Sequence, residues 1–528
     1  MSTALPILFG SNWTDEPSFA DTIKPVNPAD GIALRDSYPV STSDTLSRMA
    51  SHAKKAAEEL NHTPPEQIAM FLDTHARLID ERRTTIADIA HDETGLPRSP
   101  RLVQVEMDRT IDQLRQTAEC VRSRDWVCAR IDTTHNLRSM YEPLGGGVLT
   151  IGPNNFPLAY NGIAGGDFAA AIAARNPVIA KAHPLHPGTS RQLAQCAHDA
   201  ATTTNLPQGS VQLFYHCSPE DGLHLIRNPS ISAVGFTGSR RAGLALKQAA
   251  DETGKPIYLE LSSINPMFLM DQAVRQRGLD IADQIAESML AASGQQCTCP
   301  GLIVVRAGED AEAFVDRLRT RLDAAEPQVM LSHGGRDALH RSILQNIKRG
   351  ATCETGGKPV DGDIARYQHS LMRVDAMHFL NNHAAFQEEM FGVAALLVTC
   401  ESTKQFAAIA QHLEGNLTGT IHHEESDYEA VMTLTRSLRP QVGRLIHNGV
   451  PTGVHVNPAT VHGGPFPATG HPGFTAVGMP TSIHRFSALR CYDRADQRYL
   501  PPELRDMNPT GEMMRCIDTE WTTRSIGP

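Results

Sequence analysis

Apolar residues in the first quarter of the chain recur at the spacing of amphipathic helices. Between residues 43 and 60, for example, Leu46, Met49 and Ala53 fall on one stripe, because positions three and four apart share a helix face. The same pattern predicts four helices in this region, at residues 43–60, 64–81, 84–94 and 103–122. Residues 1–39 lack such a period, so we expect an irregular lead-in there.

The period changes to an alternation between Trp126 and Tyr141, interrupted by a polar turn at residues 133–136. Alternating apolar and polar positions predict strands, and two short strands around a turn predict a β-hairpin. An isolated hairpin is barely stable in water. We therefore expect this hairpin to pack against another element or another subunit.

From residue 145 onward, short apolar runs alternate with helical patterns. The runs predict strands at residues 146–151, 177–181, 211–214, 233–237 and 257–261. Strands and helices that alternate in this way predict a parallel, doubly wound sheet, which binds its ligands at the carboxyl ends of the strands. The loops after Ile151, Lys181 and Thr237 lie at those ends.

A second α/β region, from about residue 262 to residue 452, contains Cys297. Residues 280–292 are predicted to form a helix that Asp280 caps and Gly294 ends, and the β-branched run that follows predicts a buried strand. Cys297 would then lie on a tight connection that can present a thiol to a cleft. A lone cysteine is more commonly a small buried hydrophobe, so its position alone assigns no role.

Length and composition set the broad class. A chain of 528 residues is too long for one core and predicts two or more domains. A formal net charge of −11 argues against nucleic acid or an anionic membrane as the main partner. The ten cysteines show neither a disulfide framework nor a metal-binding pattern, so no metal is expected. Neither a secretory signal nor an apolar run of ~18 residues is present, which predicts a soluble, cytoplasmic protein with reduced cysteines.

Several polar residues at strand ends each allow two interpretations. Glu260 is either a hydrogen-bonded structural group or a general base whose pKa is raised by apolar surroundings. Asn155 is either a turn former or an amide donor to a developing oxyanion. Lys181 is either a solvated strand end or a contact for ribose or phosphate. The loop that begins Gly238-Ser239 is either a structural turn or a pyrophosphate site at a helix N-terminus.

A series of motifs, taken together and in order, resembles the aldehyde dehydrogenase superfamily. The motifs are Gly152-Pro153-Asn154-Asn155-Phe156-Pro157, Lys181, Phe236-Thr237-Gly238-Ser239, Leu259-Glu260-Leu261, Gly294-Gln295-Gln296-Cys297 and Glu388-Glu389-Met390-Phe391-Gly392. The closer likeness is to α-ketoglutaric semialdehyde (2,5-dioxovalerate) dehydrogenases and related NADP-linked fatty aldehyde dehydrogenases. That likeness rests on residues 262–266, 297–302, 443–444, 448–454 and 462–469.

The resemblance implies an α/β fold of two doubly wound parallel-sheet domains with a small β oligomerisation element. Residues 1–124 and 145–261 would form the dinucleotide-binding domain, and residues 262–469 the catalytic domain. Residues 125–144 and 470–528 would form the oligomerisation hairpin and the C-terminal arm. A homodimer or homotetramer is expected on the same ground.

The resemblance also implies the catalytic roles. Cys297 matches the nucleophile that attacks the aldehyde, and Asn155 with the Cys297 backbone N–H matches the oxyanion hole. Glu260 matches the base that activates water against the thioester. The expected reaction is NAD(P)-dependent oxidation of an aldehyde to a carboxylic acid.

The implied cofactor-binding residues are Lys181, His183, Gly238, Ser239, Glu389 and Phe391. Most members that require NAD carry a glutamate three positions after the lysine, where this chain has Pro184. No carboxylate at that position would repel a 2′-phosphate, so NADP is favoured over NAD.

The substrate is expected to be a 2-oxo-acid semialdehyde such as α-ketoglutaric semialdehyde. Phe156 and Ile163 are expected to line the aldehyde tunnel, and Arg109 to pair with a distal carboxylate or to be an ordinary solvated helix arginine. Medium- or long-chain aliphatic aldehydes are the alternative substrates. A cofactor-independent cysteine thioesterase or acyltransferase is the rival activity, disfavoured because no motif pairs a histidine with Cys297. A catalytically silent binding protein is a third possibility, disfavoured because Cys297, Glu260 and Asn155 are all present.

Overall fold

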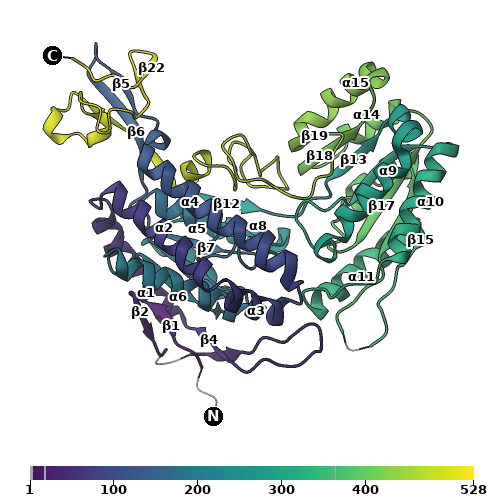
Figure 1. Ribbon diagram of the computed structural model, residues 1–528, viewed down its shortest axis with the longest axis horizontal. Coiled ribbons are helices and arrows are strands. Elements are labelled where there is room, and N and C mark those ends of the chain that lie inside the picture. The colour runs from purple at the N-terminus through teal and green to yellow at the C-terminus, as the bar shows by residue number, and fades with distance from the viewer. Residues whose placement is uncertain (1–3, 17–18, 363, 528) are drawn as a thin grey trace.

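The computed structural model describes residues 4–16, 19–362 and 364–527. Two α/β lobes lie side by side, and a small sheet near the C-terminus projects beyond the first lobe (Figure 1). Each lobe is built on a seven-stranded sheet. This arrangement confirms the predicted α/β fold with two doubly wound sheets.

The first sheet has the strand order β12-β11-β7-β8-β9-β1-β2. Its parallel part consists of β7 (Gly147–Ile151), β8 (Val178–Lys181), β9 (Val211–Phe214), β11 (Ile231–Thr237) and β12 (Ile257–Glu260). Because the strands are parallel, Ile151, Lys181, Thr237 and Glu260 all end at one edge of the sheet. The predicted ligand-binding edge is therefore formed by the predicted strands.

The predicted irregular lead-in is wrong. Strands β1 (Ile7–Phe9) and β2 (Asn12–Thr14) extend the first sheet antiparallel to β9. Strands β3 (Asp21–Ile23) and β4 (Tyr38–Ser41) form a small sheet with β10 (His216–Cys217). These strands are only two to four residues long, which is too short to show a period in the sequence, and pairing with neighbouring strands determines them.

Helices cover both faces of the first sheet. They are α1 (Ser43–Leu60), α2 (Pro65–Glu81), α3 (Arg83–Thr94), α4 (Met107–Ser123), α5 (Gly166–Ala173), α6 (Pro187–Thr203), α7 (Pro219–Arg227) and α8 (Arg240–Asp251). The four N-terminal helices are confirmed with shifts of a few residues at their starts. A π-helical segment at Arg98–Glu106 leads into α4, which therefore begins later than predicted.

The second sheet has the order β15-β16-β17-β14-β13-β18-β19. Its strands are β13 (Pro266–Leu269), β14 (Leu302–Arg306), β15 (Thr352–Thr355), β16 (Ser370–Asp375), β17 (Ala394–Cys400), β18 (Asn416–His422) and β19 (Val442–His447). Its main helices are α9 (Asp271–Leu290), α10 (Glu309–Ala324), α11 (His333–Lys348), α12 (Ala376–Asn381), α14 (Lys404–Gln411) and α15 (Tyr428–Leu438).

This second sheet is buried on both faces. Along β13, Met267 and Leu269 belong to one core cluster, whereas Phe268 belongs to the other, as does Met270 just after the strand. Successive side chains of a strand point to opposite faces. A continuous apolar run is therefore what a parallel strand between two helical layers requires.

The helix before Cys297 begins earlier than predicted. It starts at Asp271, and Asp280 lies inside it rather than at its N-cap. The backbone is irregular at Arg277, with φ −135° and ψ 17°. Because two helical stretches meet at this kink, the sequence pattern revealed only the second stretch.

The predicted hairpin is formed by β5 (Arg130–Asp132) and β6 (Leu137–Pro143). It joins C-terminal strands of the same chain, β20 (Ser487–Asp493), β21 (Arg515–Ile517) and β22 (Glu520–Thr522), in a five-stranded sheet. The domain boundaries and the assembly through this sheet stay predictions. In the part of the chain that the structure describes, no helix combines the length and apolarity needed to cross a bilayer.

Candidate active site

Cys297 lies on a connection whose backbone is fixed by left-handed conformations. After α9, Ala292, Ser293 and Gly294 have φ values of 50°, 56° and 66°. A Cβ on Gly294 would lie 2.3 Å from the Gly392 carbonyl carbon, so only glycine fits this close approach. The expected glycine stop is thus present, and the loop places Cys297 at the wall of a cavity.

Asn265 fixes the backbone of the Cys297 loop through hydrogen bonds. Its buried side-chain Nδ2 donates hydrogen bonds to the Cys297 carbonyl and the Cys299 carbonyl, each at 2.9 Å. Its Oδ1 accepts from Ser263 Oγ at 2.9 Å and from Thr418 Oγ1 at 3.0 Å. The motif that begins Ser262-Ser263 therefore supports the nucleophile loop, a role that sequence reasoning did not assign to Asn265.

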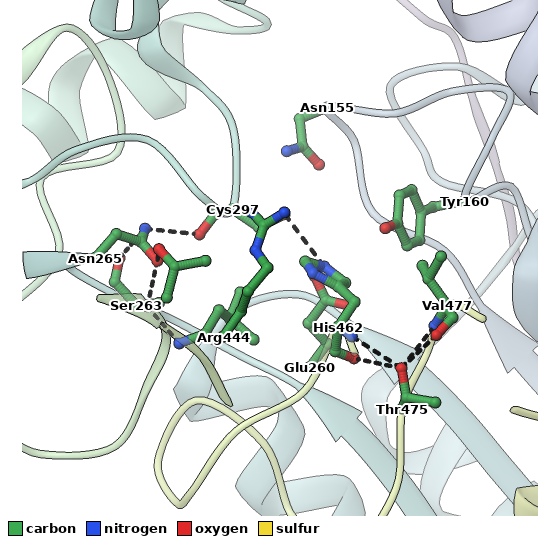
Figure 2. A network of polar contacts seen from close by, with 12 residues as sticks. Asn155, Tyr160, Glu260, Ser263, Asn265, Cys297, Arg444, His462, Thr475 and Val477 are labelled. Carbon is green, nitrogen blue, oxygen red and sulfur yellow. Dashed lines mark hydrogen bonds and ion pairs between the residues drawn. The ribbon is translucent and has the colours of Figure 1, made fainter. Parts of the chain in front are cut away.

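His462 is the functional residue that sequence reasoning missed. Its Nε2 lies 2.8 Å from Glu260 Oε1 and 3.6 Å from Cys297 Sγ. Its backbone N–H donates to Thr475 Oγ1 at 2.8 Å, which fixes the loop (Figure 2). The sequence contained the signal in the motif that begins at His462, but 165 residues separate this histidine from Cys297. The argument that no histidine pairs with Cys297 is therefore wrong.

These contacts also correct the expected ionisation of Glu260. Burial by itself raises the pKa of this carboxyl, but His462, the Cys297 thiol and the Arg109 charge together outweigh burial, and the pKa lies below its ordinary value. The pKa of the Cys297 thiol is well above its usual range, because the thiol is buried and beside Glu260. The Arg109 guanidinium opposes that rise.

Asn155 faces the same loop. It follows β7, is buried, and donates from Nδ2 to the Gln295 carbonyl at 2.9 Å. An amide nitrogen carries two N–H groups, so a second donor is left beside the nucleophile. The side chain points toward the Cys297 connection rather than merely forming a turn.

One cavity of about 990 Å³ connects this chemistry with the carboxyl edge of the first sheet. Cys297, Glu260 and Asn155 line it, together with all the predicted cofactor residues, Lys181, His183, Gly238, Ser239, Glu389 and Phe391. Its volume is at the upper end of the range for ligand pockets. The nucleophile, the carboxylate and the groups expected to hold a dinucleotide thus share one space.

The cavity residues fit a dinucleotide in their chemistry. Ser239 caps α8 with an oxygen that accepts from the Ala242 N–H at 3.3 Å, so the positive end of this helix faces the cavity. Lys181 is a cation whose Nζ donates to the Ala182 carbonyl at 3.2 Å. Burial raises the pKa of Glu389 to about 8, while Ser262 and the Ser263 backbone favour its ionised form.

The family model of the aldehyde dehydrogenase family matches residues 13–472 of this chain. The chain belongs to the aldehyde dehydrogenase family. It is 35% identical over 501 residues to α-ketoglutaric semialdehyde dehydrogenase 2 of Azospirillum brasilense, covering 93% of this chain and 94% of that protein. It is 34% identical to α-ketoglutaric semialdehyde dehydrogenase of Acinetobacter baylyi, with the same coverage of both chains. This aldehyde dehydrogenase is therefore an NAD(P)-dependent enzyme that oxidises aldehydes.

Solved structures agree on the fold of this aldehyde dehydrogenase. A mutant of aldehyde dehydrogenase C from Pseudomonas syringae, in complex with NAD+ and octanal, has a TM-score of 0.81 and 21% identity, covering 94% of this chain and 98% of that one. An NADP-dependent glyceraldehyde-3-phosphate dehydrogenase from Bacillus halodurans has a TM-score of 0.77 and 20% identity, with 93% and 100% covered.

The predicted substrate residues of this aldehyde dehydrogenase separate into two groups. Phe156 and Arg109 lie together, with the Arg109 guanidinium carbon 5.9 Å from the Phe156 ring centre. Arg109 is not a solvated helix arginine, because its Nη2 donates to the Tyr160 hydroxyl at 2.8 Å and its Nε is buried. Ile163 has no exposed surface and packs in the core, so its expected place in the tunnel is wrong.

Arg444 and Tyr160 are further residues that the sequence did not single out. The Arg444 guanidinium donates to the Pro451 carbonyl at 2.6 Å and acts electrostatically on Cys297. The Tyr160 ring lies 6.0 Å from the His462 ring. Figure 2 shows these two side chains flanking Glu260 and His462. Neither residue lines the large cavity, so both lie on the side of Cys297 that faces away from this cavity.

Proposed function

We propose that this enzyme oxidises a short aldehyde with a distal carboxylate, of the α-ketoglutaric semialdehyde class. The observation that carries the proposal is the position of Arg109. It acts electrostatically on Cys297, it is largely removed from water, and its buried Nε has no hydrogen-bond partner in the described part of the chain. An unpaired buried guanidinium N–H favours a charged acceptor. The two relatives named above carry this substrate in their names.

Arg444 strengthens the same proposal. Its Nε is also buried, with no hydrogen-bond partner from residues 4–16, 19–362 or 364–527, and burial lowers the pKa of its guanidinium. Arg109 and Arg444 thus leave two unpaired N–H donors on the side of Cys297 away from the cofactor cavity. A carboxylate has enough lone pairs to accept from both.

The proposed chemistry begins with the proton of the Cys297 thiol. His462 Nε2 lies 3.6 Å from the sulfur and accepts this proton, and the Glu260 carboxylate, whose Oε1 lies 2.8 Å from the same nitrogen, stabilises the imidazolium that forms. The thiolate attacks the carbonyl carbon, and the charge that develops on oxygen is held by Asn155 Nδ2 and the Cys297 N–H. The nicotinamide supplies the hydride acceptor when the cofactor is bound.

The second half of the reaction uses the same carboxylate. Within the residues that the structure describes, Glu260 Oε2 is buried without a hydrogen-bond partner, so it is free to accept a proton from water. Water activated in this way attacks the Cys297 thioester and releases the carboxylic acid. The low pKa of Glu260 keeps it ionised, and therefore competent as a base, at neutral pH.

We propose NADP as the preferred cofactor. The cavity wall beside Lys181 carries His183, Pro184, His216 and Ser218, none of which is acidic. A 2′-phosphate would meet one lysine and two imidazoles there, without a carboxylate to repel it. NAD would lose those contacts but meet no clash.

We also propose that the five-stranded sheet mediates self-association, as a homodimer or homotetramer. Its β20 exposes Leu489 (64% exposed), and β22 exposes Trp521 (52% exposed). These two strands are the opposite edges of the sheet, and exposed large apolar side chains on a projecting element favour an interaction surface. Analytical ultracentrifugation of the parent and of Leu489→Glu tests it, with a monomeric parent as the contradicting result.

The test of the activity is a turnover panel that measures reduced cofactor. It compares α-ketoglutaric semialdehyde with pentanal, an uncharged aldehyde of the same length, and with octanal, each with NAD and with NADP. We expect the highest kcat/KM for the semialdehyde with NADP. A preference for octanal would support medium- or long-chain aldehydes instead. No reduced cofactor from any aldehyde, together with hydrolysis of an added thioester, would support a thioesterase.

A further inference from the structure

Three groups of different chemistry converge on one point of the active site. A sulfur of Cys297, an imidazole nitrogen of His462 and a carboxylate oxygen of Glu260 all lie within 4.8 Å of one another. Thiolate, imidazole and carboxylate are the three ligand types that bind Zn²⁺ in proteins. The trio therefore has the composition of a zinc site with three protein ligands and one open position.

The sulfur-to-nitrogen distance fits that geometry. A tetrahedral zinc ion with bonds of about 2.3 Å to sulfur and about 2.0 Å to nitrogen holds those two atoms about 3.6 Å apart. The separation between Cys297 Sγ and His462 Nε2 is 3.6 Å. The contact between His462 Nε2 and Glu260 Oε1, at 2.8 Å, would have to open by about 0.5 Å. The long Glu260 side chain can make that change by rotation.

Some charges around the three groups favour a bound cation, and others oppose it. Glu260 Oε2 is buried without a partner, so a lone pair is available that water does not satisfy. A thiolate and a carboxylate supply two negative charges to a divalent ion. Arg109 and Arg444 act on the same sulfur and oppose a cation, which limits the affinity but does not occupy the ligands. Because Cys297 lines the open cavity, water can take the fourth position.

We propose that the catalytic trio doubles as a chelating site for Zn²⁺ and that its occupation switches the enzyme off. The inference rests on the proposed function, because the same three groups carry the proposed reaction. A bound ion would hold the Cys297 sulfur as a ligand and occupy His462 Nε2, the nitrogen that faces the thiol. Aldehyde and metal would thus compete for one sulfur, and a chelator would restore turnover.

The experiment titrates Co²⁺, a spectroscopic substitute for Zn²⁺, into the full-length protein without cofactor or aldehyde. We expect one ion per chain, an ultraviolet charge-transfer band from thiolate to cobalt and the strong visible bands of a four-coordinate site. Zn²⁺ should displace the cobalt and abolish both signals. Cys297→Ser and His462→Gln should each remove the charge-transfer band, and unchanged thermal melts show that these variants are folded.

Cys353→Ser is the matched control, because Cys353 is an exposed free cysteine outside the site. This variant should keep the cobalt spectrum. The inference is overturned if the parent gives no charge-transfer band, or if Cys297→Ser retains it. The cobalt readout needs no turnover: a positive spectrum with no aldehyde oxidation would reject the proposed function alone, and turnover without the spectrum would reject the metal site alone.

Discussion

The sulfur of Cys297 lies 3.6 Å from His462 Nε2, and the same nitrogen lies 2.8 Å from Glu260 Oε1. This relationship explains how a buried thiol can react. Burial and the neighbouring carboxylate hold the pKa of Cys297 well above its usual range. The thiol therefore needs a proton acceptor within reach, and the His462–Glu260 pair is that acceptor.

His462→Gln should lower kcat/KM about 10²–10⁴-fold at neutral pH, the usual contribution of a positioned acid–base group. The raised pKa of Cys297 gives the sign of the pH effect: without His462 the thiolate forms only at higher pH, so the loss shrinks as pH rises. Steady-state kinetics and the rate of iodoacetamide alkylation of Cys297, each across neutral and alkaline pH, measure the effect.

The control for this variant is His224→Gln, which changes an exposed histidine on α7 and should leave both profiles unchanged. A parallel loss at every pH in His462→Gln would contradict a role in proton transfer. It would point to a packing defect instead.

Glu260→Gln should stop the reaction after the thioester forms. The amide cannot take a proton from water, whereas oxidation of the aldehyde to the thioester does not require that step. Rapid mixing should show a burst of one reduced cofactor per active site, followed by slow turnover. Parental steady-state turnover would assign the base to another residue.

Arg109→Met should discriminate between substrates. Loss of a charged hydrogen bond costs about 1.5–3 kcal/mol, which corresponds to about a 10–150-fold lower kcat/KM for α-ketoglutaric semialdehyde. Pentanal, which lacks the carboxylate, should change less than the semialdehyde. Arg109→Lys is the conservative partner and should restore part of the preference; an equal loss for both aldehydes in Arg109→Met would reject a role in carboxylate binding.

NADP affinity should fall as pH rises, and NAD affinity should change less. Burial lowers the pKa values of His183 and His216 when the cavity is empty, and the charge of Lys181 lowers both further. A bound 2′-phosphate favours the imidazolium forms, so binding takes up protons and weakens where those protons are lost. Isothermal titration with both cofactors at several pH values measures this difference.

Two substitutions test the same wall of the cavity. His216→Asn should flatten the pH dependence of NADP binding, and Pro184→Glu should weaken NADP more than NAD through charge repulsion. A parental NADP affinity in Pro184→Glu would show that the 2′-phosphate lies elsewhere.

Asn265→Gly should destabilise the nucleophile loop. The change leaves two buried carbonyls, of Cys297 and Cys299, without their donor, at a cost of roughly 1–3 kcal/mol each. Glycine accepts the φ of 46° at this position, so the backbone is not strained by the change. Chemical denaturation measures the loss, and an unchanged unfolding free energy would mean that water replaces the amide.

The order of strands and helices in the first lobe could be predicted because each element buries one face or both, and the period of apolar residues records that burial. Short strands such as β1 and β2 could not be predicted, since two or three residues are too few to show an alternation of apolar and polar positions. The start of α9 was missed because the helix is irregular at Arg277. The burial of Ile163 in the core could not be predicted either, because an apolar side chain is equally compatible with a core and with the wall of a tunnel.

The sequence by itself determined the doubly wound fold, the family and the candidate nucleophile, base and amide, because local periodicity and ordered motifs record these directly. Only the tertiary structure decided that His462 lies between Cys297 and Glu260, that Asn265 supports the loop and that Arg109 faces the nucleophile. Those contacts join residues up to 202 positions apart. Packing of the two sheets and the C-terminal loop brings them together, and no local pattern specifies such distances.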